Sequence, residues 1–488
     1  MLKKIHGFLD KLSLPNWLLI LLFATLILRI PSFFEPYHYG DEAIYLTLGQ
    51  GIRQGVPLYS GLHDNKPPVL YLIAALAGNL VWFKILLAGS GIVAITFFAK
   101  IIARLFPASL KLQKLATIVF ALLITLPLLE GNIANAENFM MAFSLPAIYL
   151  LLVSSTLASS YLVLAGFLFG LSCLTKVPAV FDLPVVLIFW LVIGKFNFKK
   201  VFLILASFLV PVGVTFVWFY LRGSLPDYFR AAFLENIGYV SSWRPADVQK
   251  SFWVRNLPLL VRAAGVFAGG ALIFKFRQRL SKPFILASIW TFLALFAATL
   301  SERPYPHYLL QAAAPAAILF GILLASKNFN QTLTVIPLFF VFLVPVFYKF
   351  WYYPTSDYYL RFFKFALGAS SREKYFSQFN LNVSRNYQIA DFLATSSGFA
   401  ERVFVWGPDS PIIYALSRRL PPIKFTAGYH IRDFSSQKEV GRLLSQNPPR
   451  FIVLTPEAPD FAELDPLLKT AYLPINRIGN AEIWIKSR

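Results

Sequence analysis

Long apolar runs separated by short polar segments fill about the first 350 residues of the chain. A helix that crosses a bilayer needs about 20 predominantly apolar residues. The first such run covers residues 17–34 and follows Lys3, Lys4 and Lys11. No small-residue cleavage site comes after it, so we expect an uncleaved first span with its N-terminus in the cytoplasm.

The apolar stretch 67–83 decides how many times the chain crosses the membrane. If this stretch crosses, the basic loop 104–114 falls on the outer side and every later basic loop is misplaced as well. If it only lies in or dips into the outer interface, four basic loops fall on the inner side, as the positive-inside rule requires. Those loops carry Lys100, Arg104, Lys111 and Lys114, then Lys195, Lys199 and Lys200, then Lys275, Arg277, Arg279 and Lys282, and finally Lys327.

The second alternative predicts eleven spans, which leaves the C-terminus outside the cell. The predicted spans are approximately 17–34, 85–103, 115–129, 139–155, 161–175, 178–195, 201–221, 258–275, 284–300, 308–326 and 332–350. The segment between the first two spans, about residues 35–84, then forms a first outer loop with interfacial helices; it is polar as far as about residue 66. One of these, residues 43–54, is amphipathic and places Ile44, Leu48 and Ile52 on one face.

The pattern changes to that of a soluble domain after Trp351, Tyr352 and Tyr353, which form a plausible interfacial belt. Short apolar runs predict strands at 403–406, 451–454 and 483–485, with helical stretches at 412–416 and 439–444. Alternating strands and helices are typical of an α/β domain. The sequence therefore predicts a polytopic α-helical membrane domain, residues 1–350, and an extracytoplasmic α/β domain, residues 351–488.

Composition agrees with this interpretation. Hydrophobic residues make up 57% of the chain and charged residues only 14%, against about 25% charged in soluble proteins. This excludes a soluble enzyme, a disordered chain and a collagen-like fibre. The net charge of +21 sits largely in short loops between apolar runs, so the expected partner is the bilayer of the cell membrane and not a nucleic acid. The single cysteine, Cys173, excludes an intrachain disulfide.

On this topology, polar residues, most of them ionisable, collect in separate segments of the outer side. They are Asp41 and Glu42, then His63 and Lys66 in the first loop, Glu137 and Asn138 in the second turn, Lys176 in the third, and Arg303, His307 and Tyr308 in the fourth, with Gln311 one turn later. Each has an ordinary explanation by itself. Asp41 and Glu42 can be solvated loop charges, Lys66 and Lys176 can snorkel from span ends, and Glu137 can interact with a helix N-terminus.

The combination favours chemistry. Carboxylates beside cations suit group transfer from a phosphate ester, since a base accepts the proton of an acceptor hydroxyl while cations stabilise the departing phosphate. Ionisable groups at the membrane edge are functional candidates. No Gly-x-Gly-x-x-Gly or phosphate-loop pattern follows a strand to hold a nucleotide, so a donor at an outer, membrane-level site would most simply arrive as a lipid. We expect Asp41, Lys66, Lys176 and Arg303 to share one pocket.

Several motifs resemble those of the GT-C glycosyltransferases, with the protein O-mannosyltransferases and lipid A aminoarabinose transferases as the nearer groups. The motifs are Gly40-Asp41-Glu42-Ala43-Ile44-Tyr45, His63-Asp64-Asn65-Lys66-Pro67-Pro68, Asn135-Ala136-Glu137, Leu174-Thr175-Lys176, and Arg303-Pro304-Tyr305-Pro306-His307-Tyr308 with Gln311 and Pro315. They occur in the family's order along about residues 15–350, which makes the resemblance fairly specific.

The resemblance implies an inverting transfer of a sugar from a polyprenyl phosphate to a glycan, lipid or protein acceptor at the outer face. It implies Asp41 as the general base with Glu42 supporting it, and Lys66, Lys176, Arg303 and His307 as contacts of the donor phosphate. Acceptor or sugar contacts would come from Glu137, Asn138, His63, Tyr45, Tyr308 and Gln311. Metal-using aminoarabinose transferases have an acid where this chain has Asn65, so no cofactor is certain, and a divalent metal is left open but not supported.

Two other classes compete with a transferase. A transporter or lipid flippase would use the same cations, but it predicts two related halves and charges deep in several spans. No internal repeat is visible, and spans 85–103, 115–129 and 332–350 are nearly free of interior charge. A non-catalytic anchor for the C-terminal domain would need far fewer than eleven spans.

Overall fold

The structure is a computed structural model that describes residues 14–153, 159–239, 251–325 and 329–487. Contacts divide the chain into two compact units. The helical unit comprises Met1–Ile30, Leu87–Thr215 and Ile237–Thr355, and the mixed unit comprises Pro31–Leu86, Phe216–Asn236 and Ser356–Arg488. Composition placed 31–86 and 216–236 with the membrane part, whereas by contacts they group with the C-terminal residues. The domain boundary at about residue 350 stays a prediction.

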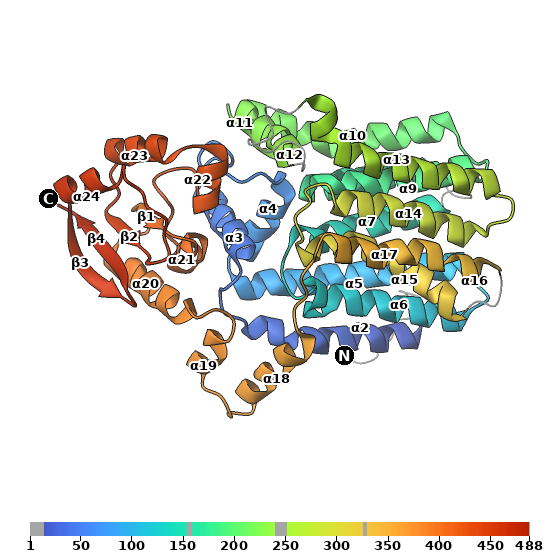
Figure 1. Ribbon diagram of the computed structural model, residues 1–488, viewed down its shortest axis with the longest axis horizontal. Coiled ribbons are helices and arrows are strands. Elements are labelled where there is room, and N and C mark those ends of the chain that lie inside the picture. The colour runs from blue at the N-terminus through green and yellow to red at the C-terminus, as the bar shows by residue number, and fades with distance from the viewer. Residues whose placement is uncertain (1–13, 154–158, 240–250, 326–328, 488) are drawn as a thin grey trace. The chain divides into compact units, whose positions relative to one another are not determined.

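Apolar helices, most of them long, lie alongside one another in the helical unit (Figure 1). They are α2 (Asn16–Arg29), α5 (Leu80–Leu105), α6 (Leu110–Thr125), α7 (Ala136–Val153), α8 (Ser159–Thr175), α9 (Leu183–Val192), α10 (Phe198–Leu221), α13 (Phe252–Phe276), α14 (Lys282–Ala298), α15 (Leu310–Ala325), α16 (Phe329–Leu333) and α17 (Val335–Phe347). Short 3-10 turns η1 (Ile30–Phe34), η2 (Pro127–Leu129), η3 (Val177–Asp182) and η7 (Pro306–Leu309) connect or extend them.

Each of the eleven predicted spans falls on one of these helices. Seven helices among the described residues are long and apolar enough to cross a bilayer: Asn16–Phe34, Leu80–Leu105, Ala136–Val153, Phe198–Leu221, Phe252–Phe276, Pro306–Ala325 and Phe329–Phe347. The polytopic helical fold is confirmed, and the chain is a multi-pass membrane protein. The exact number of eleven stays a prediction.

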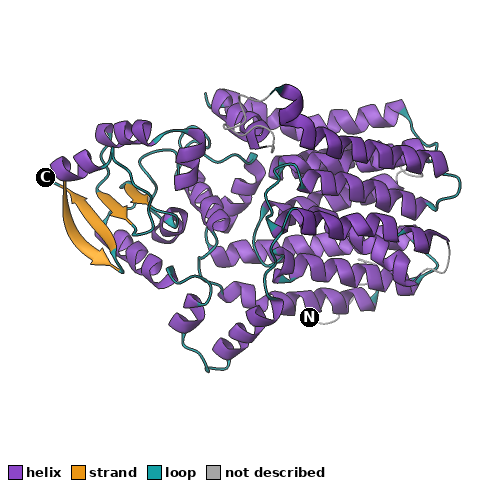
Figure 2. Cartoon of the chain, in the orientation of Figure 1, coloured by secondary structure: helices purple, strands orange, loops and turns teal. Residues whose placement is uncertain are grey.

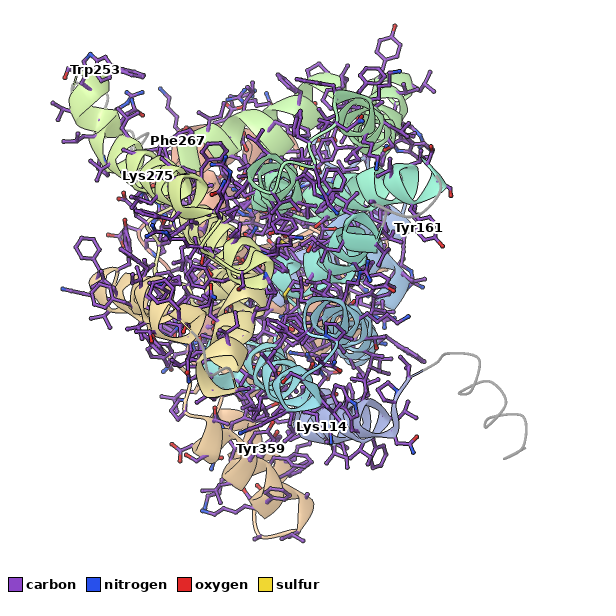
Figure 3. All side chains as sticks on the ribbon, turned by 90° about the vertical axis from the view of Figure 1, so that its right-hand side faces the viewer. Lys114, Tyr161, Trp253, Phe267, Lys275 and Tyr359 are labelled. Atoms are coloured by element: carbon purple, nitrogen blue, oxygen red, sulfur yellow. The ribbon has the colours of Figure 1, made fainter. Side chains whose placement is uncertain are left out.

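Apolar side chains cover the outside of these helices. Along α13 only 6% of the most apolar window is buried inside the protein. Trp253 and Phe267 on this helix are 71% and 79% exposed, and Figure 3 shows them on the outside of the helices. Surfaces of this kind are satisfied by lipid tails and not by water.

The basic loops lie at one end of the helical unit. The connections α5–α6, α9–α10 and α13–α14 are all at the right-hand end in Figure 1, and Lys114 and Lys275 are seen at that end in Figure 3. The polar turns α6–α7, α8–η3 and α14–η7 are at the opposite end. This separation is the arrangement that the positive-inside argument predicts. Lys3, Lys4, Lys11 and Lys327 lie outside the described residues.

The stretch 67–83 is broken into two helices. Helix α4 (Pro68–Ala77) has ten residues, or about 15 Å at 1.5 Å per residue, which is half of a hydrocarbon core of about 30 Å. Gly78 ends it in the left-handed conformation with φ 70°, as helix-terminating glycines commonly do. The next helix, α5, starts at Leu80.

The expected helix near residues 43–54 is present as α3 (Gly40–Arg53), but it is not an open amphipathic helix. All its residues from Glu42 to Gly49 are buried, because α4 and α21 (Ser410–Ser417) pack against it. Gly49 permits this packing, since a Cβ atom there would come within 2.5 Å of the Ala75 backbone nitrogen.

The C-terminal part of the mixed unit contains a four-stranded sheet in the order β1-β2-β4-β3 (Figure 2). Strands β1 (Val403–Trp406) and β2 (Phe451–Leu454) are parallel, whereas β4 (Ala481–Lys486) is antiparallel to both β2 and β3 (Tyr472–Ile478). The helices of this region are α18 (Thr355–Ala366), α19 (Arg372–Ser377), α20 (Val383–Ser396), α21, α22 (Gly428–Phe434), α23 (Gln437–Gln446) and α24 (Asp465–Ala471). A second segment contributes α11 (Leu225–Phe229), the π-turn η4 (Arg230–Leu234) and α12 (Glu235–Tyr239).

The three predicted strands and both predicted helical stretches of the α/β region are confirmed. Strand β3 was missed. Its residues 473–477 are all exposed and include Pro474, so it shows neither a buried apolar run nor the composition of a central strand.

Candidate active site

Lys66 lies between two carboxylates of the mixed unit. Its ammonium nitrogen is 3.9 Å from Asp41 Oδ2 and 3.8 Å from Asp64 Oδ2. The Tyr45 hydroxyl donates a 2.9 Å hydrogen bond to Asp41 Oδ2, and the Lys66 ammonium is 4.9 Å from the centre of the Tyr45 ring. The first-loop cluster consists of Asp41, Tyr45, Asp64, Lys66 and Tyr71.

Local sequence explains these positions. Asp41 is in the first turn of α3, where the helix dipole stabilises a negative charge, and Tyr45 is one turn further on the same face. Lys66 precedes Pro67, which is held extended at φ −66° and ψ 164° before α4 begins. The Tyr59 hydroxyl donates to the Lys66 carbonyl oxygen at 2.8 Å. The lysine backbone is therefore fixed at both sides.

Asp64 is a site residue that the sequence analysis missed, although it stands inside a quoted motif. Its side chain is 2% exposed, accepts a 2.8 Å hydrogen bond from the Tyr71 hydroxyl, and lies 3.5 Å from His430 Nε2. Burial alone would raise the pKa of the Asp64 carboxyl. Lys66, His430 and Tyr71 outweigh burial and hold that pKa well below its usual range.

The two carboxylates at Lys66 are therefore not equivalent. Asp64 is buried and held as an anion, whereas the Asp41 side chain is 31% exposed. Since Asp64 already balances the charge of Lys66, Asp41 is the acid of this cluster that can receive a proton from a molecule outside the protein.

Glu42 faces the interior. It is 2% exposed and its Oε1 lies 2.6 Å from Lys84 Nζ. The same ammonium is 2.9 Å from Glu35 Oε2, and the Tyr358 hydroxyl donates to Glu35 Oε1 at 2.5 Å. Of the Asp41–Glu42 pair, only Asp41 reaches the surface.

His63 is also internal, with 3% exposure. Its Nε2 lies 3.1 Å from Glu235 Oε2, and its ring packs against Phe425 and Phe434. The next residue but one, Asn65, accepts a 2.7 Å hydrogen bond from the Asn236 side chain at its carbonyl oxygen.

A second group of charges occupies the polar turns of the helical unit. The Lys176 ammonium pairs with Glu137 and lies 4.1 Å from the centre of the Tyr308 ring. His307 Nδ1 pairs with Glu130, and its Nε2 is 3.8 Å from Glu137 Oε1. The turn cluster consists of Glu130, Glu137, Lys176, His307 and Tyr308.

Backbone geometry builds the turn cluster. Glu130 has the left-handed conformation with φ 58°, which is uncommon for a residue other than glycine. The buried Arg29 side chain donates to the carbonyl oxygens of Gly131 at 2.9 Å and Ile124 at 2.8 Å, and so ties α2 to the end of α6. Lys176 follows the last residue of α8, where the helix dipole favours a cation.

Glu130 was missed because an acid at the edge of a polar turn gives no separate signal in sequence. The remaining predicted residues of the helical unit surround the cluster. Asn138 donates to the Ile133 carbonyl oxygen at 3.0 Å, and Gln311 donates to Asp182 Oδ1 at 3.2 Å. Arg303 is partly exposed in the loop between α14 and η7.

The first-loop cluster and the turn cluster belong to different units. The expectation that Asp41 and Lys66 share a pocket with Lys176 and Arg303 stays a prediction.

An apolar cavity of about 370 Å³ lies in the helical unit. Its lining comes from α6, α14, α15, α17 and neighbouring turns: Val119, Leu123, Leu128, Leu129, Leu295, Leu309, Ala312, Ala313, Ala316, Phe320, Val341, Phe342, Pro345 and Tyr352. The cavity exists because the alanine side chains of α15 are too small to fill this space. Leu129 and Leu309 adjoin Glu130 and Tyr308 of the turn cluster in sequence, so the cavity extends to the residues beside that cluster.

The residues present do not fit a three-ligand metal centre. Within the described ranges, His, Cys, Asp and Glu side chains form no group of three or more that could hold a metal ion. Asn65 occupies the position at which metal-using aminoarabinose transferases have an acid, and its carbonyl oxygen accepts a hydrogen bond from the Asn236 side chain.

Comparisons with known proteins bear on the fold. The sequence matches no protein-family model and no curated protein. Among solved structures, ArnT from Cupriavidus metallidurans bound to undecaprenyl phosphate is similar, with a TM-score of 0.58 at 15% identity over 96% of this chain and 98% of that one. The chain has the GT-C fold. The apo state of the same ArnT gives a TM-score of 0.53 at 15% identity over 96% of this chain and 97% of that one.

Asp64→Asn tests the buried anion. We expect the variant to lower the free energy of unfolding at pH 7 by about 3 kcal/mol, because a hydrogen-bonded buried charge opposite Lys66 is lost. A carboxyl with a lowered folded-state pKa contributes fully above its unfolded pKa of about 3.9 and loses that contribution as pH falls further. The difference from wild type should therefore shrink below about pH 4. Thermal unfolding in detergent at pH 7 and pH 3 measures it.

The exposed Asp391→Asn serves as the matched control and should unfold like wild type at both pH values. An Asp64→Asn protein as stable as this control at pH 7 would contradict the assignment.

Proposed function

We propose that the protein is a membrane glycosyltransferase that moves a sugar from a polyprenyl phosphate to a hydroxyl of a glycan, lipid or protein acceptor at the outer face. The observation that carries the proposal is Asp41, an accessible carboxylate 3.9 Å from Lys66 in a chain with the GT-C fold. The ArnT structure of the same fold was obtained with undecaprenyl phosphate bound, which supports a polyprenyl-linked donor.

The reaction needs one base and one leaving group. Asp41 accepts the proton of the acceptor hydroxyl as its oxygen forms a bond to the anomeric carbon of the sugar. The bond between that carbon and the phosphate oxygen breaks, and the electron pair leaves with the polyprenyl phosphate. Attack on the face opposite the leaving group inverts the anomeric centre, as in inverting glycosidases.

Cations stabilise the charge that develops on the departing phosphate. Lys176, His307 and Arg303 supply this charge in the helical unit, and Lys66 supplies it in the mixed unit. Lys176 is paired with Glu137 and its side chain is 14% exposed. A phosphate that binds Lys176 therefore competes with Glu137 for the ammonium.

The other predicted contacts divide by exposure. Tyr308 lies beside the Lys176 ammonium and is partly exposed, so it contacts the sugar directly. Asn138, His63 and Gln311 are at most 5% exposed, and they act on the acceptor by fixing the walls of the site. Tyr45 acts through its hydrogen bond to Asp41.

Asp41→Asn removes the base and leaves the shape of the side chain. We expect transfer from a polyprenyl-phosphate sugar to fall by about 10²–10⁴-fold, with the protein folded. Mass spectrometry of donor consumption by the purified protein, with a set of polyprenyl-phosphate sugars, measures it. Asp357→Asn, an exposed acid at the start of α18, should keep full activity. Full activity of Asp41→Asn would remove Asp41 as the base.

The apolar cavity offers a place for the isoprenoid chain of the donor. Ala316→Phe should fill it and raise the KM of a long-chain donor about tenfold, which corresponds to about 55 Å² of lost apolar contact. The KM of a donor analogue with a short chain should change less than about twofold. Ala271→Phe on the exposed face of α13 is the control. Equal effects of Ala316→Phe on both donors would exclude the cavity as the chain site.

We propose that the N-terminus is cytoplasmic and the C-terminal region outside, because the basic loops gather at the end opposite the turn cluster. Alkaline phosphatase, which is active only outside the cytoplasm, should be active when fused after residue 487 and inactive when fused in the α5–α6 loop. The reverse result would invert the topology and place Asp41 on the cytoplasmic side.

A further inference from the structure

Two buried carboxylates outside the predicted site set are connected through lysines to Asp41 or to its neighbour Glu42. Glu35 is 7% exposed and Asp64 is 2% exposed. In each carboxylate, one oxygen pairs with a lysine ammonium, and the other oxygen contacts a side chain of the C-terminal region. Glu35 connects Lys84 to Tyr358, and Asp64 connects Lys66 to His430.

The first connection leads to the helix that carries Asp41. Tyr358 on α18 donates to Glu35, which pairs with Lys84 at 2.9 Å, and Lys84 pairs with Glu42 at 2.6 Å. Glu42 is the direct neighbour of Asp41 in the first turn of α3. The network therefore fixes the rotation of this turn.

Stability alone does not account for these ions. Burial of each charge costs several kcal/mol, and well-packed apolar side chains of similar volume are often equally stable or better. Lys84 is completely buried between two carboxylates, so the three groups carry an excess negative charge that hydrogen bonds from groups such as Tyr358 must help to stabilise. Such an arrangement fixes the relative positions of these side chains but lowers the free energy of unfolding.

The second connection leads to the lysine opposite Asp41. His430 Nε2 on α22 lies 3.5 Å from Asp64 Oδ1, and Asp64 holds Lys66 at 3.8 Å. The loop itself pairs with the C-terminal chain, since the His63 N–H donates to the Lys424 carbonyl oxygen at 2.8 Å. His430 therefore acts on Lys66 through Asp64.

Both connections lie inside one compact unit. Helix α21 packs against α3, and the Thr47 hydroxyl donates to the Pro411 carbonyl oxygen at 3.4 Å. The C-terminal region is thus packed directly on the helix that bears the base.

We propose that the C-terminal region is a positioning part of the active site. Tyr358, through Glu35 and Lys84, sets the orientation of the Asp41 turn. His430, through Asp64, sets the position of the Lys66 ammonium. Neither residue touches the reacting atoms. The contacts stand on the geometry, whereas their effect on transfer rests on the proposed glycosyltransferase function.

The first experiment needs no enzymatic activity. Purified full-length protein is treated with an amine-reactive ester, and the modification rate of Lys66 is followed by mass spectrometry of its peptide. Because His430 restrains Lys66 through Asp64, His430→Asn should raise this rate at least fivefold, and Asp64→Asn should raise it as well. Lys176, in the other unit, serves as the internal reference and should react as in wild type.

Arg432→Gln is the matched control, since Arg432 is on the same helix as His430 and its side chain is 75% exposed. It should leave the Lys66 rate unchanged. The connection through His430 would be overturned if Lys66 were modified faster in Asp64→Asn but at the same rate in His430→Asn as in Arg432→Gln.

The second experiment separates positioning from binding. A displacement of about 1 Å can cost about 10²-fold in rate, so Tyr358→Phe and His430→Asn should lower kcat by about 10–100-fold. The KM for the donor should stay within about twofold and Arg432→Gln should behave as wild type. An unchanged kcat in both variants, or a loss confined to KM, would overturn the proposal. If wild type consumes no polyprenyl-phosphate sugar, the proposed function fails, and the Lys66 rates still decide the positioning contacts.

Discussion

The Lys66 ammonium between Asp41 and Asp64 is the interaction on which the candidate chemistry depends. One cation cannot neutralise two carboxylates, so the environment of each acid decides its role. Asp64 is enclosed by Tyr71 and His430 and remains an anion, and Asp41 keeps access to the surface. Two acids beside a shared lysine thus become different: Asp64 is a buried counter-ion, and Asp41 is the accessible carboxylate to which the proposed function assigns the role of base.

In the turn cluster of the helical unit, basic side chains are likewise paired with carboxylates. Lys176 and His307 are cations or potential cations that pair with Glu137 and Glu130 when no ligand is bound. Carboxylates keep these groups ordered near the membrane edge, where an uncompensated charge would be expensive. In the proposed function, a donor phosphate replaces one of these carboxylates as the anionic partner, so binding does not require isolated charges to be brought together.

Much of the fold followed from the sequence because a bilayer imposes a simple rule. Apolar runs within a bilayer must form helices, and the eleven predicted spans fall on helices. The short apolar runs at 403–406 and 451–454 were predicted for a different reason, since runs of four residues are typical of buried strands, and both are strands in the structure. The distribution of basic loops predicted that 67–83 does not cross the membrane, but it did not predict that the stretch breaks at Gly78 and that α5 begins at Leu80. Strand β3 could not be predicted, because its exposed residues gave no apolar pattern.

The members of the two charge clusters were partly predictable from motifs, but their pairings were not. The motifs contain Asp41, Lys66, Glu137, Lys176 and His307, which the structure places in these clusters, whereas Asp64 and Glu130 were not among the candidate residues. Their importance comes from partners that are distant in sequence, such as His430 for Asp64 and His307 for Glu130. The interior position of Glu42 also depends on Lys84, which in sequence is only an interruption in an apolar run.

The discontinuous make-up of the mixed unit has a consequence for biosynthesis. The 269 residues between positions 86 and 356 must be translated before the last segment of that unit can join the first, which takes about 13 s even at about 20 residues per second. During that interval the loop bearing Asp41 has emerged without its packing partners. A nascent or prematurely terminated chain can therefore insert its membrane helices while the loop that carries Asp41 still lacks its contacts with residues 356–488.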